Sequence, residues 1–175
     1  MEQKQTNSHD RKLPAWEKDF ILHHLDASGQ FLFFQMHPVD QRHALDVAKS
    51  VLAKQDCEPE ISSEPLVQAA LLHDIGKVSD ELKPLMRLMV GLIKRIAPKW
   101  LARSADRNGG VFARACYVDL NHPARGAYMA ATFGVSPEVA AIIRTHHEPP
   151  KTGEPLILKY IREADKRSAA GLWRH

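Results

Sequence analysis

The chain has 175 residues, of which 44% are apolar and 26% are charged, and its formal net charge is +3. This length fits one domain that buries a core without disulfides, and the composition excludes the disordered, fibrous and membrane-spanning classes. The mild positive charge does not favour nucleic acid as a partner. Two distant cysteines, no apolar leader and no membrane-length apolar stretch predict a cytoplasmic protein without a membrane span.

Apolar residues recur at helical spacing along nearly the whole chain, and the alternation typical of strands is scarce. Residues 1–13 are polar and predict a flexible tail, which leaves 14–175 as one helical domain. Helices are predicted at 14–26, 38–55, 64–76, 79–97, 121–133, 136–147 and 154–169. Glycine, proline and polar residues predict loops at 28–29, 58–59, 108–110 and 148–153. The aromatic run at 31–34 leaves a short extended piece open, but the predicted fold is an all-α, single-domain bundle.

The helix predicted at 38–55 carries His43 on the same stripe as Val47 and Val51. A lone histidine in such a place is more often a side chain at the core edge, hydrogen-bonded to backbone, than a metal ligand. His43 is therefore a candidate ligand only together with other residues.

The helix predicted at 64–76 ends in His73 and Asp74 within an apolar sequence. Burying an ionised carboxylate beside an imidazole costs free energy unless something pairs with both, and a divalent metal ion is such a partner. Lys77 follows three residues after Asp74, so a continuing helix projects its ammonium to the same side, where it would bind phosphate. The alternative is an ordinary helix end with solvated polar residues and a capping Gly76.

Residues 79–110 are predicted to form a helical insertion with a basic face. Its apolar face from 82 to 100 consists of Leu85, Met86, Met89, Leu92, Ile93, Ile96 and Trp100. Lys83, Arg87 and Lys94 are expected on the opposite side. Four interpretations remain open: packing on the core with a solvated basic side, a lid over the metals, a dimer face, or a surface that contacts anionic lipid.

His122 opens the helix predicted at 121–133, and Gly126, one turn later, permits a close approach of backbone to its imidazole. His146 and His147 end the next helix, and His146 continues its apolar face. Each pattern also has an ordinary explanation. His122 fits an exposed first turn capped by Asn121, and paired histidines complement the negative end of a helix dipole.

Asp165 lies on or beside the buried stripe of the helix predicted at 154–169. An unpaired carboxylate there is costly, so it needs a metal ion or a basic partner such as Arg162 or Lys166. Singly, each candidate has a structural explanation. Jointly, five helices supply ligand-type residues in the order His, His-Asp, His, His-His, Asp, and this set favours a metal site.

This ordered set resembles the HD-domain superfamily of metal-dependent phosphohydrolases, which have an all-α core. The resemblance covers about residues 38 to 168, and the matching stretches are 42–48 (RHALDVA), 71–77 (LLHDIGK), 121–127 (NHPARGA), 143–148 (IRTHHE) and 161–165 (IREAD). It is closest to the branch with the His-Asp-Ile-Gly form of the motif. The Gly-Tyr-Pro motif of the cyclic-di-GMP phosphodiesterase branch is missing, since residues 148–155 read EPPKTGEP, and this disfavours cyclic-di-GMP as the substrate.

The resemblance implies one or two divalent metal ions, with Fe, Mn, Ni, Co and Mg all permitted. It implies a first site from His43, His73, Asp74 and Asp165. It implies a second site from His122, His146 and His147, with Asp74 bridging. A metal-bound hydroxide, oriented by Asp74, would attack a nucleotide or other small phosphate ester, while Lys77 and the weaker candidate Arg125 bind phosphate oxygens. A di-iron oxygenase of the same superfamily and a non-catalytic metal- or nucleotide-binding module remain alternatives, and a homodimer is a further hypothesis.

Overall fold

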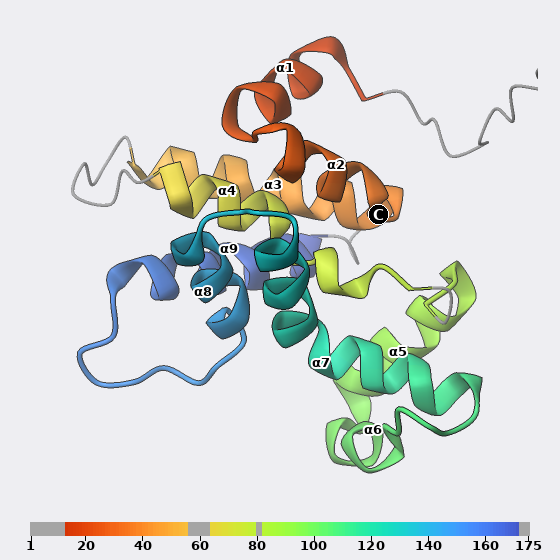
Figure 1. The fold of residues 1–175 in the computed structure, drawn as a ribbon. Coiled ribbons are helices and arrows are strands. Elements are labelled where there is room, and N and C mark those ends of the chain that lie inside the picture. The colour runs from red at the N-terminus through yellow and green to blue at the C-terminus, as the bar shows by residue number, and fades with distance from the viewer. Residues whose placement is uncertain (1–12, 56–63, 80–81, 172–175) are drawn as a thin grey trace, which may run out of the picture.

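The computed structural model describes residues 13–55, 64–79 and 82–171. Within these ranges the secondary structure is helical and contains no strand, which confirms the all-α prediction (Figure 1). In chain order the elements are α1 (Ala15–His24), α2 (Ala27–Gln35), α3 (Pro38–Gln55), α4 (Glu64–Leu72), the 3₁₀ turn η2 (Ile75–Lys77), α5 (Pro84–Ile96), α6 (Pro98–Ser104), α7 (Val111–Thr132), α8 (Pro137–Thr145) and α9 (Leu156–Gly171). None of the described helices is both long enough and apolar enough to cross a bilayer.

The buried apolar side chains form two clusters. The larger one lies among α1 to α4, α8, α9 and the second half of α7, and its fully buried members include Phe33, Leu45, Leu71, Ile143 and Ile161. The smaller one lies between α5, α6 and the first half of α7, and its buried members are Leu82, Val90, Leu101, Ala115, Cys116 and Val118. In Figure 1 α5 and α6 lie with the start of α7 at one end of the molecule. The long helix α7 therefore connects both clusters.

The segment at 27–35 differs from its prediction. The loop expected at 28–29 and the extended piece considered at 31–34 are both wrong, because these residues form α2. Asp26 starts this helix by accepting a hydrogen bond from the amide of Gly29 at 2.8 Å. Leu32 and Phe33 are buried, whereas Phe31 stacks on Phe133 at the surface with ring centroids 5.3 Å apart. A capped turn and tertiary packing of the aromatic rings thus override the turn tendency of glycine.

The helix predicted at 79–97 begins at Pro84 and ends at Ile96, while residues 80–81 lie outside the described ranges. Its end follows from Pro98, because a proline disfavours helical backbone in the residue before it. Pro98 itself opens α6, where its missing N–H costs nothing. The loop predicted at 108–110 is confirmed, as is the loop at 148–153, whereas the one at 58–59 lies outside the described residues.

The helix predicted at 121–133 begins ten residues earlier, at Val111. Asn121 is therefore not a cap: its side-chain amide donates to the carbonyl of Tyr117 at 2.8 Å inside the helix. Pro123 lies inside α7 as well. The apolar residues Ala115, Cys116 and Val118 of the smaller cluster supply the packing that extends the helix upstream, and this packing was not visible in the local pattern.

The turn η2 packs directly on the backbone of α7. A Cβ atom added at Gly76 would lie 2.0 Å from the carbonyl oxygen of His122 and 2.6 Å from the amide nitrogen of Gly126. Only a glycine permits this approach. Gly126 takes part in the same contact, since a Cβ there would meet the amide nitrogen of Gly76 at 3.2 Å, whereas the expected approach of backbone to the His122 imidazole stays a prediction. This contact places Asp74 beside His122.

Candidate metal centre

The predicted metal ligands lie around one cleft of about 360 Å³. Four of them line it, and these are His43, Asp74, His147 and Asp165. The other three are fully buried, and these are His73, His122 and His146. The structure therefore brings together all seven side chains from α3, α7, α9 and the turns that follow α4 and α8.

The three fully buried histidines share one hydrogen-bonding pattern. In each of them Nδ1 contacts the backbone carbonyl oxygen three residues earlier, at 2.8 Å for His73 to Ala70, 2.5 Å for His122 to Asp119 and 2.6 Å for His146 to Ile143. Because a carbonyl oxygen only accepts, each Nδ1 carries a proton and donates it. In the neutral ring, Nε2 is then unprotonated and has a free lone pair.

The local sequence explains why these carbonyl groups are free. His73 and His146 directly follow the last residues of α4 and α8, and carbonyl groups of the last helical turn have no amide partner within the helix. His122 lies inside α7, but the next residue, Pro123, has no N–H that could bond to Asp119 one turn earlier. Two helix ends and one proline thus orient three imidazoles in the same way.

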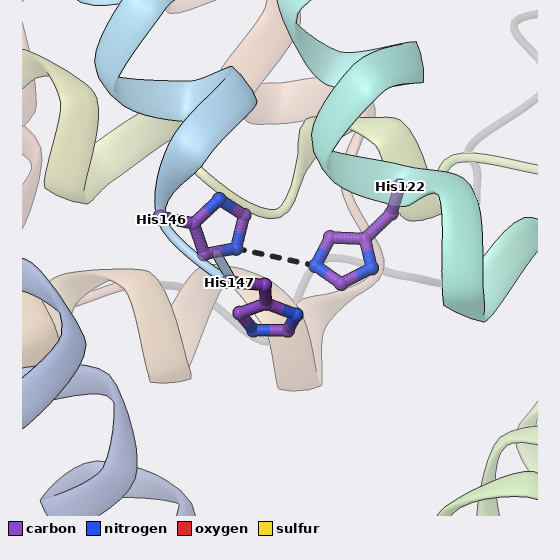
Figure 2. A group of neighbouring side chains, drawn as sticks. All are labelled: His122, His146 and His147. Atoms are coloured by element: carbon purple, nitrogen blue, oxygen red, sulfur yellow. Dashed lines mark hydrogen bonds between the residues drawn. The ribbon is translucent and has the colours of Figure 1, made fainter. Parts of the chain in front are cut away.

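The unprotonated nitrogens point towards one another. Nε2 of His122 lies 3.3 Å from Nε2 of His146, along the dashed line in Figure 2. A hydrogen bond across this gap requires a second proton on one ring, and hence a charge. Burial opposes that charge, because it lowers the pKa of His122 to about 4 and the pKa of His146 well below its ordinary value. Among the residues that the structure describes, Nε2 of His73 has no hydrogen-bond partner. A bound cation would satisfy these lone pairs.

The two carboxylate oxygens of Asp74 point to different histidines. Oδ1 lies 3.2 Å from Nε2 of His122, whereas Oδ2 lies 3.7 Å from Nε2 of His73 and 3.9 Å from Nε2 of His43. Oδ2 also accepts a hydrogen bond from Nζ of Lys77 at 2.7 Å. Burial alone would raise the pKa of Asp74, but the Lys77 ammonium and the histidines hold it well below its usual range. Asp74 therefore stays ionised between two groups of imidazoles.

Asp165 connects the two histidines on the open side of the cluster. Its Oδ1 lies 2.9 Å from Nε2 of His43, and its Oδ2 lies 3.2 Å from Nε2 of His147. Burial alone would raise the pKa of Asp165, but the hydrogen bonds from these histidines keep it below its usual range. Ser168, one turn along α9, lies with its hydroxyl 2.9 Å from Nδ1 of His43. This serine fixes the orientation of the His43 ring.

Three overlapping groups of ligand atoms are each compact enough to hold an ion, since the atoms of each group lie within 4.8 Å of one another. The groups are His43 with His73 and Asp165, His122 with His146 and His147, and His73 with Asp74 and His146. The first two groups adjoin different oxygens of Asp74. Neutral imidazole and carboxylate suit first-row divalent ions. The arrangement is therefore compatible with one or two such ions.

Lys77 and Arg125, the predicted phosphate-binding residues, have different surroundings. Lys77 lines the cleft beside Asp74. The Arg125 guanidinium donates to the carbonyl oxygens of Gly76 at 3.0 Å and Val78 at 3.2 Å, and it is not one of the cleft-lining residues. These contacts support a role for Arg125 in holding η2 against α7 rather than the predicted contact with phosphate.

Two ion pairs at the cleft were not predicted from the sequence. Arg87 of α5 binds Asp40 of α3 at 2.5 Å, and Lys94 of α5 binds Asp119 of α7 at 3.0 Å. All four side chains line the cleft, so Arg87 and Lys94 face the cleft. The only local signal was the position of Asp119, which precedes His122 by three residues and therefore shares its helix face.

An all-α domain that gathers five histidines and two aspartates around one cleft has the properties of a divalent-metal-binding domain. The family model described as HD domain matches residues 41–170, and the chain belongs to the HD-domain family. The predicted membership of this superfamily is thereby confirmed, whereas the His-Asp-Ile-Gly branch stays a prediction. Domains of this family are commonly metal-dependent phosphohydrolases. No curated protein and no solved structure matched the chain.

Proposed function

We propose that this protein is a metal-dependent phosphohydrolase that acts on a nucleotide or another small phosphate ester. In this proposal one divalent ion is bound by His43, His73, Asp74 and Asp165. A second ion is bound by His122, His146 and His147, with Asp74 shared between the two. The observation that carries the proposal is the 3.3 Å approach of two Nε2 atoms, in His122 and His146, whose protons are on the other ring nitrogens. Two buried lone pairs face each other stably only when a cation lies between them.

The charges of the cleft support an anionic substrate. Its lining contains four carboxylates and four cationic side chains, and these are Asp40, Asp74, Asp119, Asp165, Lys77, Arg87, Lys94 and Lys166. With neutral histidines these charges cancel, so bound divalent ions make the cleft positive. The volume of about 360 Å³ is in the range of small-ligand sites. A phosphate ester with a small alcohol or nucleoside group matches both properties.

The side chains have separate tasks in the proposed reaction. Bound divalent ions supply Lewis acidity, which lowers the pKa of a water molecule and polarises a phosphoryl group. Lys77 keeps Asp74 ionised and offers its remaining N–H groups to a phosphate oxygen at the cleft wall. Asp165 keeps the rings of His43 and His147 turned to the cleft. Lys166 is exposed at the cleft and adds a further cation for the substrate.

The oxygenase alternative uses the same ligands, so the ligand set does not distinguish it. The cations of the cleft do not distinguish it either, because an oxygenase also binds an organic substrate, which can be anionic. A non-catalytic module differs from both enzymes only in its lack of turnover, and turnover can be interpreted only once metal binding is known. For that reason the first experiment measures metal.

Metal content is measured on protein purified without an affinity tag and without added metal. The wild type is expected to contain about two equivalents of divalent ions such as iron, manganese or nickel. Asp74→Ala should lose them, whereas Asp19→Ala, which removes an exposed carboxylate on α1, should keep them. No metal in the wild type, even after incubation with these ions, would refute the proposed site.

Turnover is then measured on a panel of phosphate esters and nucleotides, with and without oxygen. We expect phosphate release that does not depend on oxygen and that Lys77→Met reduces while metal content is retained. Strict dependence on oxygen and reduced iron would instead establish the oxygenase. Metal binding without turnover under either condition would leave the binding module as the function.

A further inference from the structure

The outer face of α5 is an apolar stripe that faces solvent. It consists of Leu85, Leu88, Met89, Leu92 and Ile96, whose exposed fractions lie between 41% and 71%. These positions recur at each helical turn, which is the spacing of a helix face that is normally buried. Of the interpretations left open by the sequence, packing on the core does not hold for Leu85, Met89, Leu92 and Ile96. Contiguous apolar surface of this kind marks an interaction site.

The opposite side of α5 packs against the rest of the domain and lines the cleft. Met86, Val90 and Ile93 pack in the smaller cluster, while Arg87 and Lys94 reach the cleft and pair with carboxylates. Val90 also lines the cleft. With 3.6 residues per turn, the cleft-lining positions and the outer face lie on opposite sides of the helix. The outer face is therefore not a lid for the cleft in this structure.

Four exposed cationic side chains lie at the ends of α5 and on α6. Lys83 and Arg95 lie at the two ends of α5, Lys99 and Arg103 lie on α6, and all four are exposed. None of the four takes part in an ion pair among the residues that the structure describes. No acidic residue occurs from 82 to 105. Trp100 of α6, with 52% of its surface exposed, adds an aromatic side chain of the type that favours the membrane–water interface.

We propose that α5 and α6 dock this surface on an anionic lipid bilayer, with the outer face of α5 among the acyl chains and the four cations at the headgroups. An exposed apolar stripe bordered by lysine and arginine is the pattern of helices that lie in the plane of the interface. A second copy of the chain fits less well. A symmetric pair on this face would bring like cations together, and the segment has no carboxylate to neutralise them.

This inference does not depend on the proposed hydrolase activity. It has a geometric consequence for any activity of the cleft, however. Because α5 separates the two features, docking on the bilayer leaves the cleft on the side of α5 that faces away from the lipid. A water-soluble substrate then has access to a membrane-bound protein.

The test is co-sedimentation of the full chain with vesicles of phosphatidylcholine alone or mixed with phosphatidylglycerol. Wild type should bind the anionic vesicles at least tenfold more tightly than the neutral ones, and added salt should weaken this binding. The double variant Leu92→Ser/Ile96→Ser should bind the anionic vesicles at least tenfold more weakly than wild type. Arg95→Gln/Lys99→Gln should lose roughly fivefold per charge, since each basic residue at an anionic surface contributes about that factor. The matched control Leu22→Ser/Leu156→Ser removes two leucines that are 52% and 53% exposed on α1 and α9, and it should bind like wild type.

Insertion is measured separately by the fluorescence of Trp100 in a Trp16→Phe/Trp173→Phe background. A blue shift with anionic vesicles is expected, and the apolar double variant should abolish it. The substituted side chains that the structure describes are exposed, and thermal melting checks that all variants remain folded. Absence of binding, equal binding to both vesicle types or unchanged binding of the apolar variant would overturn the proposal. A dimer in lipid-free solution that Leu92→Ser/Ile96→Ser dissociates would overturn it in favour of a second copy.

Discussion

Pro123→Ala should make the protein more stable and its metal site weaker. Pro123 lies inside α7, where it removes the N–H that would bond to the carbonyl of Asp119. In the structure this carbonyl oxygen instead accepts a hydrogen bond from Nδ1 of His122 at 2.5 Å. An alanine restores the backbone donor, which then competes with the imidazole for the same oxygen. The His122 ring is consequently free to turn, and its Nε2 no longer points permanently to His146.

The two effects have opposite signs and estimable sizes. A proline inside a helix costs about 3 kcal/mol relative to alanine. The hydrogen bond from His122 to the freed carbonyl offsets about 1 kcal/mol of this, so the metal-free variant should gain about 2 kcal/mol. For a chain of this length that corresponds to a rise in Tm of roughly 4–8 °C. Loss of the hydrogen bond that orients a histidine ligand typically lowers metal affinity by about 10- to 100-fold.

The assay combines thermal melts of the metal-free proteins with calorimetric titration of Mn²⁺. The control is Pro137→Ala, because Pro137 occupies the first turn of α8, where proline is favourable and no imidazole depends on it. We expect this control to be slightly less stable and to bind Mn²⁺ like wild type. A Pro123→Ala protein that is more stable but keeps its full affinity would refute the link between the proline and the orientation of His122.

Three further predictions concern the same site. Gly76→Ala forces a methyl group to within 2.0 Å of the His122 carbonyl oxygen, so thermal melts should show a loss of about 3 kcal/mol in the free energy of unfolding. A methyl group at Gly110 meets nothing within 4 Å, so the control Gly110→Ala should change this free energy by less than about 0.5 kcal/mol. Ser168→Ala removes the 2.9 Å partner of His43 and should weaken Mn²⁺ binding roughly tenfold in titrations while folding is retained. In urea unfolding, the metal-free protein should be on the order of 2 kcal/mol less stable at pH 5.5 than at pH 6.5. The three buried histidines have lowered pKa values in the folded state, so the unfolded chain binds more protons in this range. A stability that does not change with pH would contradict this prediction.

Much of the fold was predictable because helices are encoded by local periodicity. The helices at 38–55 and 136–147 were found within two residues of their observed ends, and the proline at Pro137 marked the start of α8. Errors occurred where tertiary packing decides. α2 forms across a glycine because its aromatic side chains find partners, and α7 extends to Val111 because the smaller cluster covers its first half. Neither partner is near in sequence.

The candidate site likewise has features that the sequence predicts and features that depend on tertiary structure. The residue types of the site and their order could be predicted from the sequence, because a buried His-Asp pair needs a charge partner wherever it lies in the fold. The free carbonyl behind each buried histidine has a local cause, but it was not predicted, because the predicted helices ran to 76 and 147 and Pro123 was expected in a first helical turn. By contrast, the salt bridge from Arg87 to Asp40 joins residues 47 positions apart, and no local pattern reports such a pair.

The sequence by itself thus determined the helical class of the fold and the set of seven candidate ligands. Only the tertiary structure decided that the three Nε2 atoms converge, that Asp74 lies between two groups of histidines and that Arg125 holds a turn. It also decided that the apolar stripe of α5 faces solvent rather than a core. The physical reason is that backbone hydrogen bonds and helix periodicity act over a few residues, whereas burial and charge pairing depend on segments that meet only in the folded chain.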